Sequence, residues 1–204
     1  MAKNNILGVI LAGGKSKRFG EDKAKAKLGN KTLLEHTISK LEKNFKEILV
    51  IENKKNDIQD KKNIFSTKDI IDGYLGPLVG VLSAMDWIKR NKKNYNWLAT
   101  FPCDTPFFDE NIIDKVKRCP NNSSKKLFFL KRKNRRHNIF GLWSLELKDI
   151  LFQDINSGYR KVEEWANKVG SEIIEINDKN DYSFLNINTK EDLQKAKKKL
   201  NEFI

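Results

Sequence analysis

In the first half of the chain, apolar runs of strand length alternate with segments of helical period. Residues 6–11 form a continuous apolar run flanked by asparagines and glycines, which is typical of a buried parallel strand. Apolar side chains then recur at helical spacing over residues 33–45, after a capping-box pattern of Thr32 and Glu35. Further strands are expected at residues 48–51, 63–66 and 97–101, and further helices at residues 77–88 and 109–117. This alternation predicts a sheet with helices packed on its faces.

The second half of the chain is less regular. An antiparallel pair is expected at residues 127–130 and 139–143, further strands at 173–176 and 184–187, and helices at 145–152, 160–169 and 190–203. The last helix is covered with lysine and would pack through leucine and alanine. No internal repeat and no linker rich in Gly, Ser or Pro interrupts the pattern. We therefore expect residues 1–204 to form one mixed α/β domain.

Composition narrows the class of protein without choosing a function. Forty Lys and Arg against 27 Asp and Glu give the 204 residues a formal charge of +13, which would attract anionic partners. The lysines are scattered, however, and the densest cluster, residues 131–136, is interpreted as a polar hairpin loop without a nucleic-acid-binding motif. The opening apolar stretch is too short for a signal peptide, and Cys103 and Cys119 form no CxxC pair. We expect a cytoplasmic protein with no nucleic-acid or membrane partner.

A glycine-rich basic loop follows the first expected strand. Gly13 and Gly14 let backbone amides approach an anion, and basic side chains surround them, namely Lys15, Lys17, Arg18 and Lys23. A Walker A motif fails here because Val9 stands where its first glycine is required, and the spacing of the GxGxxG motif is also absent. The loop is therefore predicted to bind a polyphosphate in a different manner.

A second segment, PCDTPF at residues 102–107, places Asp104 directly after another expected strand. Ligands collect at the carboxyl edge of an open α/β sheet. A carboxylate there is suited to hold Mg²⁺, which takes oxygen ligands and bridges to phosphates. Alone, such an aspartate is more often a turn former, but together the two segments predict a site for a metal and a triphosphate.

Six segments in order resemble one enzyme family. LAGGKSKRFGEDKA at residues 11–24 is similar to the LAGGxSxRMGxDKA pattern of nucleotidyltransferases, and in its LAGG form resembles the molybdenum cofactor guanylyltransferase (MobA) family. The other matching segments are GPLVG at 76–80, CDTPF at 103–107, FGLW at 140–143, SGYRKVEEW at 157–165 and FLNINTKEDL at 184–193. The resemblance covers essentially the whole chain. It implies one nucleotidyltransferase domain with a Rossmann-like three-layer α/β fold, a mostly parallel sheet and an added antiparallel pair in the second half.

The resemblance also implies an activity and its ligands. The expected reaction is transfer of GMP from GTP to the molybdopterin cofactor, with Mg²⁺ bound by Asp104. Proteins that deliver the cofactor or mature molybdoenzymes are implied as further partners. Catalytic roles fall by resemblance on Lys23, Arg18 and Asp104. The expected nucleotide contacts are Leu11, Ala12, Gly13, Gly14, Lys23, Asn53, Asp69 and Asp104. The expected acceptor contacts are Gly76, Gly80, Asn186 and Asn188.

Alternatives remain open at the level of sequence. Related enzymes use CTP or another nucleoside triphosphate, on the pterin or on a different small phosphorylated acceptor, and they more often show LAAG than LAGG. A nucleic-acid-binding protein that exploits the +13 charge would leave the GPLVG and CDTPF segments unexplained. Of the two histidines, His36 is expected to pack within a helix, and His137 is an alternative contact for the acceptor.

Overall fold

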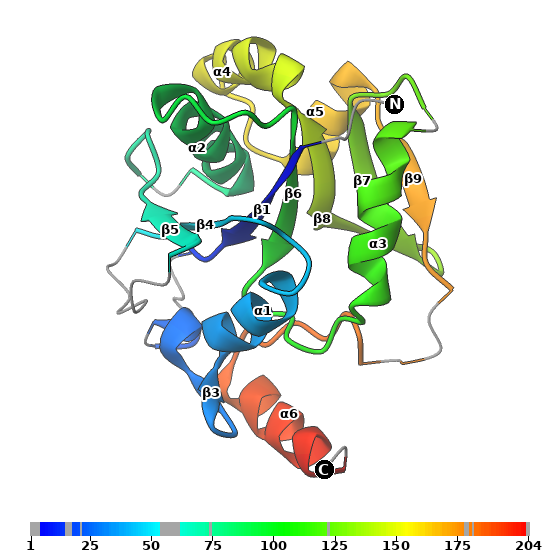
Figure 1. The fold of residues 1–204 in the computed structure, drawn as a ribbon. Coiled ribbons are helices and arrows are strands. Elements are labelled where there is room, and N and C mark those ends of the chain that lie inside the picture. The colour runs from blue at the N-terminus through cyan, green and yellow to red at the C-terminus, as the bar shows by residue number, and fades with distance from the viewer. Residues whose placement is uncertain are drawn as a thin grey trace.

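A seven-stranded sheet runs through the centre of the molecule in the order β5-β4-β1-β6-β8-β7-β9 (Figure 1). The computed structural model describes residues 5–14, 18–20, 22–53, 62–73, 75–121, 123–177, 180 and 182–202. The strands of the sheet are β1 (Ile6–Leu11), β4 (Ile48–Ile51), β5 (Ile64–Thr67), β6 (Trp97–Pro102), β7 (Leu127–Arg132), β8 (Arg135–Ser144) and β9 (Glu172–Glu175). Among these described strands, β8 alone runs against the others. The mostly parallel, Rossmann-like sheet with an antiparallel pair in the second half is confirmed.

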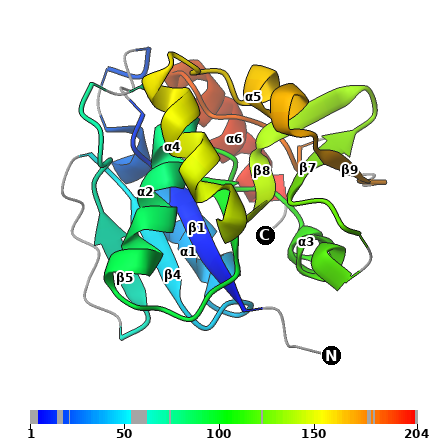
Figure 2. The ribbon, with the colours of Figure 1, turned by 90° about the horizontal axis from the view of Figure 1, so that it is seen from above.

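Helices cover both faces of this sheet, as the alternating pattern predicts (Figures 1 and 2). The helices are α1 (Leu33–Leu41), α2 (Pro77–Arg90), α3 (Asn111–Arg118), α4 (Lys148–Asn156), α5 (Val162–Val169) and α6 (Lys190–Glu202). Strand β1 sends Ile6 and Ile10 into the core shared with α1 and α3, and Leu7 and Val9 into the core shared with α2, α4 and α5. The continuous apolar run therefore reflects burial on both faces of a parallel strand.

The carboxyl ends of β1 and β6 lie side by side. Their parallel register pairs Leu11 with Pro102, and the backbone amide of Cys103 donates to the carbonyl oxygen of Leu11 at 3.4 Å. In the sheet, the strands β4 and β5 lie on one side of β1, and β6 lies on the other side of β1. This is the arrangement at which the loops of an open sheet diverge and leave room for a ligand.

A third, smaller core joins the two ends of the chain. The short hairpin of β2 (Lys27–Leu28) and β3 (Lys31–Thr32), which the sequence did not predict, packs with α6 at the bottom of the view in Figure 1. Phe19, 1% exposed, lies in this core with Leu193 and Ala196 of α6. The loop after β1 is thereby tied to the closing helix.

One expected strand is wrong. Residues 184–187 form no strand, although Phe184 and Ile187 are buried. The backbone amide of Leu185 donates to the carbonyl oxygen of Tyr182 at 2.9 Å, which closes a turn. The backbone amide of Ile187 donates to the backbone carbonyl oxygen of Asp104 at 2.8 Å. Phe184 and Ile187 thus pack into two different cores rather than along a sheet ladder. No helix within the described ranges is both long and apolar enough to cross a membrane.

The capping box at the start of α1 has the form expected from the sequence. The hydroxyl of Thr32 accepts from the amide of Glu35 at 3.1 Å, and the Glu35 carboxylate accepts from the amide of Thr32 at 2.6 Å. Replacing Thr32 with Ala removes one of these bonds, so we expect Thr32→Ala to lower the free energy of unfolding by about 1 kcal/mol. Denaturant titration measures this loss, and Thr32→Ser, which keeps the hydroxyl, is the matched control. Equal stability of the Ala and Ser variants would contradict the assignment.

Candidate active site

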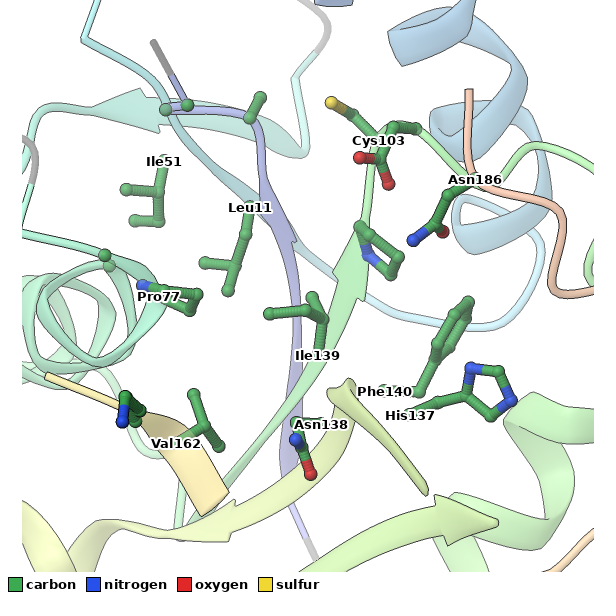
Figure 3. A pocket seen from close by; sticks show the side chains of 18 of the residues that line it. Leu11, Ile51, Pro77, Cys103, His137, Asn138, Ile139, Phe140, Val162 and Asn186 are labelled. Atoms are coloured by element: carbon green, nitrogen blue, oxygen red, sulfur yellow. The ribbon is translucent and has the colours of Figure 1, made fainter. Parts of the chain in front are cut away.

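A cavity of about 860 Å³ opens at the carboxyl edge of β1, β4 and β6. Figure 3 shows side chains from the strand ends, from the start of α2 and from β8 surrounding it. The expected site residues that line the cavity are Leu11, Ala12, Gly13, Gly14, Lys23, Asp69, Gly76, Gly80, Asp104 and Asn186. Residues far apart in sequence therefore meet in one cavity of the size that binds small molecules.

The cavity contains a close ion pair between the glycine-loop region and the end of β6. The ammonium nitrogen of Lys23 lies 2.6 Å from Oδ2 of Asp104, and the two side chains are 16% and 20% exposed. Lys23 begins a short 3₁₀ turn (Lys23–Lys25) that Asp22 caps by accepting from the amide of Ala24 at 3.1 Å. The two predicted catalytic groups therefore lie in direct contact.

The segment before α6 meets the same pair. Oδ1 of Asn188 accepts from the Lys23 ammonium at 3.1 Å. Thr105, fully buried, donates its hydroxyl to Oδ1 of Asn186 at 2.5 Å and lies 3.2 Å from Oδ1 of Asp104. Three separate segments thus hold the Asp104 carboxylate and its lysine in place.

A second polar group lies on the other side of the glycine turn. Nδ2 of Asn53 donates to the carbonyl of Gly13 at 3.1 Å and to Oδ2 of Asp69 at 2.7 Å. A Cβ atom at Gly13 would lie 2.9 Å from Nδ2 of Asn53, so any other residue here would displace the Asn53 amide. Burial raises the pKa of Asp69, while the Asn53 hydrogen bond opposes that rise. Oδ1 of Asp69 is buried and has no hydrogen-bond partner among the residues that the structure describes.

The GPLVG segment forms the start of α2 at the edge of the cavity. Gly76 precedes the helix with a φ of 98°, a conformation that favours glycine, and Pro77 opens the first turn. A side chain at Gly80 would meet Leu11 at 3.1 Å and Asp69 at 3.8 Å. Gly80 therefore lies at the Asp69 end of the cavity, close to the predicted nucleotide contacts.

The opposite wall is basic and comes largely from β8 and the turn before α5. Its cationic residues are Arg135, Arg136, Arg160 and Lys161. The register between β7 and β8 shifts beyond Phe129 and Gly141, so residues 138–140 bulge toward the cavity. Arg160 is held by the carbonyls of Ile155 and Tyr159 at 2.6 and 2.7 Å. Glu163 also lines this wall, with its carboxylate 3.6 Å from Arg136, so the wall presents an excess rather than a uniform field of positive charge to an anionic ligand.

His137 belongs to this wall and is packed against an aromatic ring. Its ring stacks on Phe184 at 3.9 Å between centroids, and Phe140 lies edge-on to Phe184 at 5.3 Å. Burial, with the charges of Arg135 and Arg132, lowers the pKa of His137 to about 4. The imidazole is therefore neutral near pH 7. His36, in contrast, lies 2.7 Å from the carbonyl oxygen of Leu28 and packs as expected within α1.

Several expected and unexpected residues fall elsewhere. Arg18 is exposed and is absent from the described lining of the cavity, and Lys15 and Lys17 lie outside the described residues. Asn53 and Asn188 act on the cavity through Asp69 and Lys23. Nothing in the sequence distinguishes Thr105 from its neighbours in the CDTPF segment. The basic cluster that contains Arg135 and Arg136 predicts a polar hairpin loop, and only the fold shows that both residues line the cavity.

The donor groups limit how a metal can bind. Within the part of the chain that the structure describes, no three acidic, histidine or cysteine side chains gather into a metal cluster. Asp104 supplies one carboxylate, which fits Mg²⁺ held jointly by a carboxylate, phosphate oxygens and water. A glycine turn beside such a carboxylate, at the carboxyl edge of a Rossmann-like sheet, is typical of nucleotide-binding α/β proteins.

Comparison with known proteins agrees with this class. A family model described as MobA-like NTP transferase domain matches residues 8–169. A protein of Haemophilus influenzae named molybdenum cofactor guanylyltransferase is 32% identical over 192 residues, which cover 94% of this chain and 97% of the relative. The chain therefore belongs to the MobA-like NTP transferase family, and it is a nucleotidyltransferase.

Solved structures share the fold at low sequence identity. Molybdopterin-guanine dinucleotide biosynthesis protein A from Archaeoglobus fulgidus superimposes with a TM-score of 0.78 at 18% identity, covering 96% of this chain and 99% of that one. 4-diphosphocytidyl-2C-methyl-D-erythritolsynthase from Anaerococcus prevotii gives 0.75 at 14%, covering 98% and 97%. The fold alone therefore does not select a nucleotide base.

The neutral His137 makes stability depend on pH. An imidazole in an unfolded chain has a pKa of about 6.5 and binds a proton below that pH. In the folded protein, the imidazole of His137 binds this proton only near pH 4. Stability is therefore full above pH 6.5 and falls as the pH drops toward 4. His137→Phe keeps an aromatic ring against Phe184, and its melting temperature should fall less over this window. Parallel melting curves for the two proteins would contradict a neutral buried imidazole.

Proposed function

We propose that the protein transfers GMP from GTP to the molybdopterin cofactor in a Mg²⁺-dependent reaction, giving the molybdopterin guanine dinucleotide form and pyrophosphate. One observation carries this proposal: the Lys23–Asp104 ion pair and the glycine turn line the same cavity. The family of the chain and a relative named molybdenum cofactor guanylyltransferase support the choice of substrates.

The reaction needs positioning more than a side-chain nucleophile. An oxygen of the acceptor's terminal phosphate attacks the α-phosphorus of GTP, and the bond from that phosphorus to the leaving pyrophosphate oxygen breaks. Both reactants are anions, so the protein must hold them together and offset the charge that develops. Cys103 is buried and its pKa is raised to about 12, mainly by burial, so it is unsuited to act as a nucleophile.

The residues divide the task along the cavity. The amides of Gly13 and Gly14 and the ammonium of Lys23 would bind the phosphates, and Asp104 would bind the Mg²⁺, which supplies positive charge to the triphosphate. Arg18, which is exposed beside undescribed residues, stays a predicted phosphate contact. The nucleotide would thus be bound by groups that follow β1 and by a group that follows β6.

Asp69 favours guanine as the base. Its buried Oδ1 lacks a partner within the described part of the chain, and Asp69 lines the same cavity as Leu11 and Gly13. Guanine presents two neighbouring donors, N1–H and N2–H, that a carboxylate can accept together, whereas cytosine presents only one donor beside an acceptor. A buried acceptor left without a partner is costly, so its satisfaction by guanine would discriminate between the bases.

The acceptor would bind at the basic wall. Arg135 and Lys161 line this end of the cavity with His137, and Asn186 faces it from the segment before α6 (Figure 3). Positive charge suits the acceptor's phosphate, and neutral His137 offers one donor and one acceptor to a polar ring. Gly76 stays a predicted acceptor contact, while the neighbours of Gly80 favour the nucleotide end. Two further expectations also stay predictions: that residues 1–204 form one domain, and that a partner protein delivers the acceptor.

Removing the proposed metal ligand should abolish turnover. Incubation of the wild-type protein with GTP, Mg²⁺ and molybdopterin, followed by mass analysis, should yield the guanine dinucleotide. Asp104→Ala should lose at least about a hundredfold in rate, since it removes the group that holds the charge-offsetting ion. Asp149→Ala, an exposed aspartate at the start of α4, is the matched control. Turnover at the wild-type rate by a folded Asp104→Ala protein would refute the metal role.

Base selection gives a separate test. We expect the wild-type protein to bind GTP with Mg²⁺ more tightly than CTP, and Asp69→Ala to lose about tenfold in GTP affinity with little change for CTP. Because burial raises the pKa of Asp69, GTP binding should also weaken on acidification at a higher pH than an exposed aspartate would give. Calorimetric titration across pH measures both effects. Tighter binding of CTP than of GTP by the wild-type protein would end the guanylyl assignment.

A further inference from the structure

The Asp104 carboxylate is engaged by a cation at one of its two oxygens, while the hydroxyl proton of Thr105 is donated to Asn186 rather than to the carboxylate. Oδ2 accepts from the Lys23 ammonium at 2.6 Å, and Oδ1 lies 3.2 Å from the hydroxyl of Thr105. A dication brought to this carboxylate would meet the positive charge of Lys23 at the same place, and like charges a few ångströms apart repel strongly in a part-buried site. For Asp104 to hold a metal through Oδ2, Lys23 would have to leave that oxygen.

Phosphate oxygens and the side-chain oxygen of Asn188 could both bind the released Lys23 ammonium. Lysine has three N–H donors, and the metal arrives with a triphosphate whose oxygens accept them. The second contact of Lys23, Oδ1 of Asn188 at 3.1 Å, is a neutral amide oxygen outside the carboxylate that the metal claims. This bond can persist while the bond to Asp104 is exchanged for one to phosphate.

Asn188 is itself firmly placed. Its backbone amide and that of Thr189 both donate to Oδ2 of Asp192 at 3.0 Å, and the amide of Asp192 donates to the hydroxyl of Thr189 at 3.1 Å. This reciprocal cap fixes the start of α6 next to the cavity. Because these bonds use the backbone of Asn188, its side chain is left to reach Lys23, and its removal spares the cap.

We propose that Asn188 is a positioning residue for Lys23, holding the ammonium beside the phosphates when a metal–nucleotide takes Lys23's place on Asp104. The inference rests on the proposed function for the identity of that ligand, Mg²⁺ with GTP. It moves Asn188 from the acceptor contacts that the sequence predicts to the nucleotide side of the cavity. It also makes Lys23 a stand-in cation that keeps Asp104 from binding metal alone.

The stand-in role is tested with Mn²⁺ in the absence of nucleotide. Free Mn²⁺ is followed by electron paramagnetic resonance as it is titrated into each protein. Lys23→Met should bind Mn²⁺ on the order of tenfold more tightly than the wild-type protein, since a competing and repelling charge is gone. Lys93→Met is the matched control, because it breaks a comparable pair of 2.7 Å with Glu47 at the opposite end of β4. Equal Mn²⁺ affinity in the wild-type and Lys23→Met proteins would overturn the stand-in role.

The positioning role is tested with GTP and Mg²⁺ in a double-mutant cycle. Asn188→Ala should weaken GTP binding roughly tenfold, the effect of one hydrogen bond to a charged group. If Asn188 acts through Lys23, adding Asn188→Ala to Lys23→Met should weaken binding no further. Asn91→Ala, which removes an asparagine amide at the far end of α2, should match the wild-type protein, and thermal unfolding confirms that each variant is folded.

The outcomes separate this inference from the proposed function. Additive losses in the cycle, or an Asn188→Ala protein that raises only the KM for the acceptor, would overturn the positioning role. If the wild-type protein shows the expected Mn²⁺ and GTP results but makes no dinucleotide, the proposed acceptor is wrong. The positioning role of Asn188 is then still supported. Absence of any GTP binding would overturn both.

Discussion

The ion pair between Lys23 and Asp104 is the contact on which the site depends. It exists because β1 and β6 are neighbours in the sheet, with Leu11 opposite Pro102, so that the segments following them leave the same edge together. Phe19 anchors the glycine loop region in the small core under α6, and the amide of Ile187 binds the carbonyl of Asp104. Segments from the first and the last parts of the chain therefore support the ion pair beside the glycine turn.

The cavity has two chemically different ends because two kinds of element line it. At one end, parallel strand ends and the start of α2 bring small residues and the buried carboxylate of Asp69 close together. At the other end, the antiparallel strand β8 contributes arginines and the stacked, neutral His137. The bulge of β8 turns residues 138–140 toward the cavity, which a straight ladder would not do. A nucleotide suits the first end and a phosphorylated acceptor suits the second.

Much of the sheet was predictable because burial leaves a direct trace in sequence. Strands buried on both faces appear as continuous apolar runs, and the Thr32 cap appears as a capping box. The segment at 184–187 misled the pattern because its apolar residues are buried in two cores by turns. The position of Arg135 beside the cavity was also hidden, since a basic hairpin has the same composition whether it faces solvent or a cavity. Proximity across the fold, such as that of Asn188 to Lys23, leaves no periodic signal.

A crystal structure of the protein with Mn²⁺ and a non-hydrolysable GTP analogue tests the central claim most directly. We expect an anomalous peak for the metal between the Asp104 carboxylate and the phosphates, with the Lys23 ammonium on a phosphate oxygen and still within reach of Asn188. Guanine should lie against Asp69. A nucleotide bound outside this cavity, or a metal held away from Asp104 while Lys23 stays paired with it, would contradict the account.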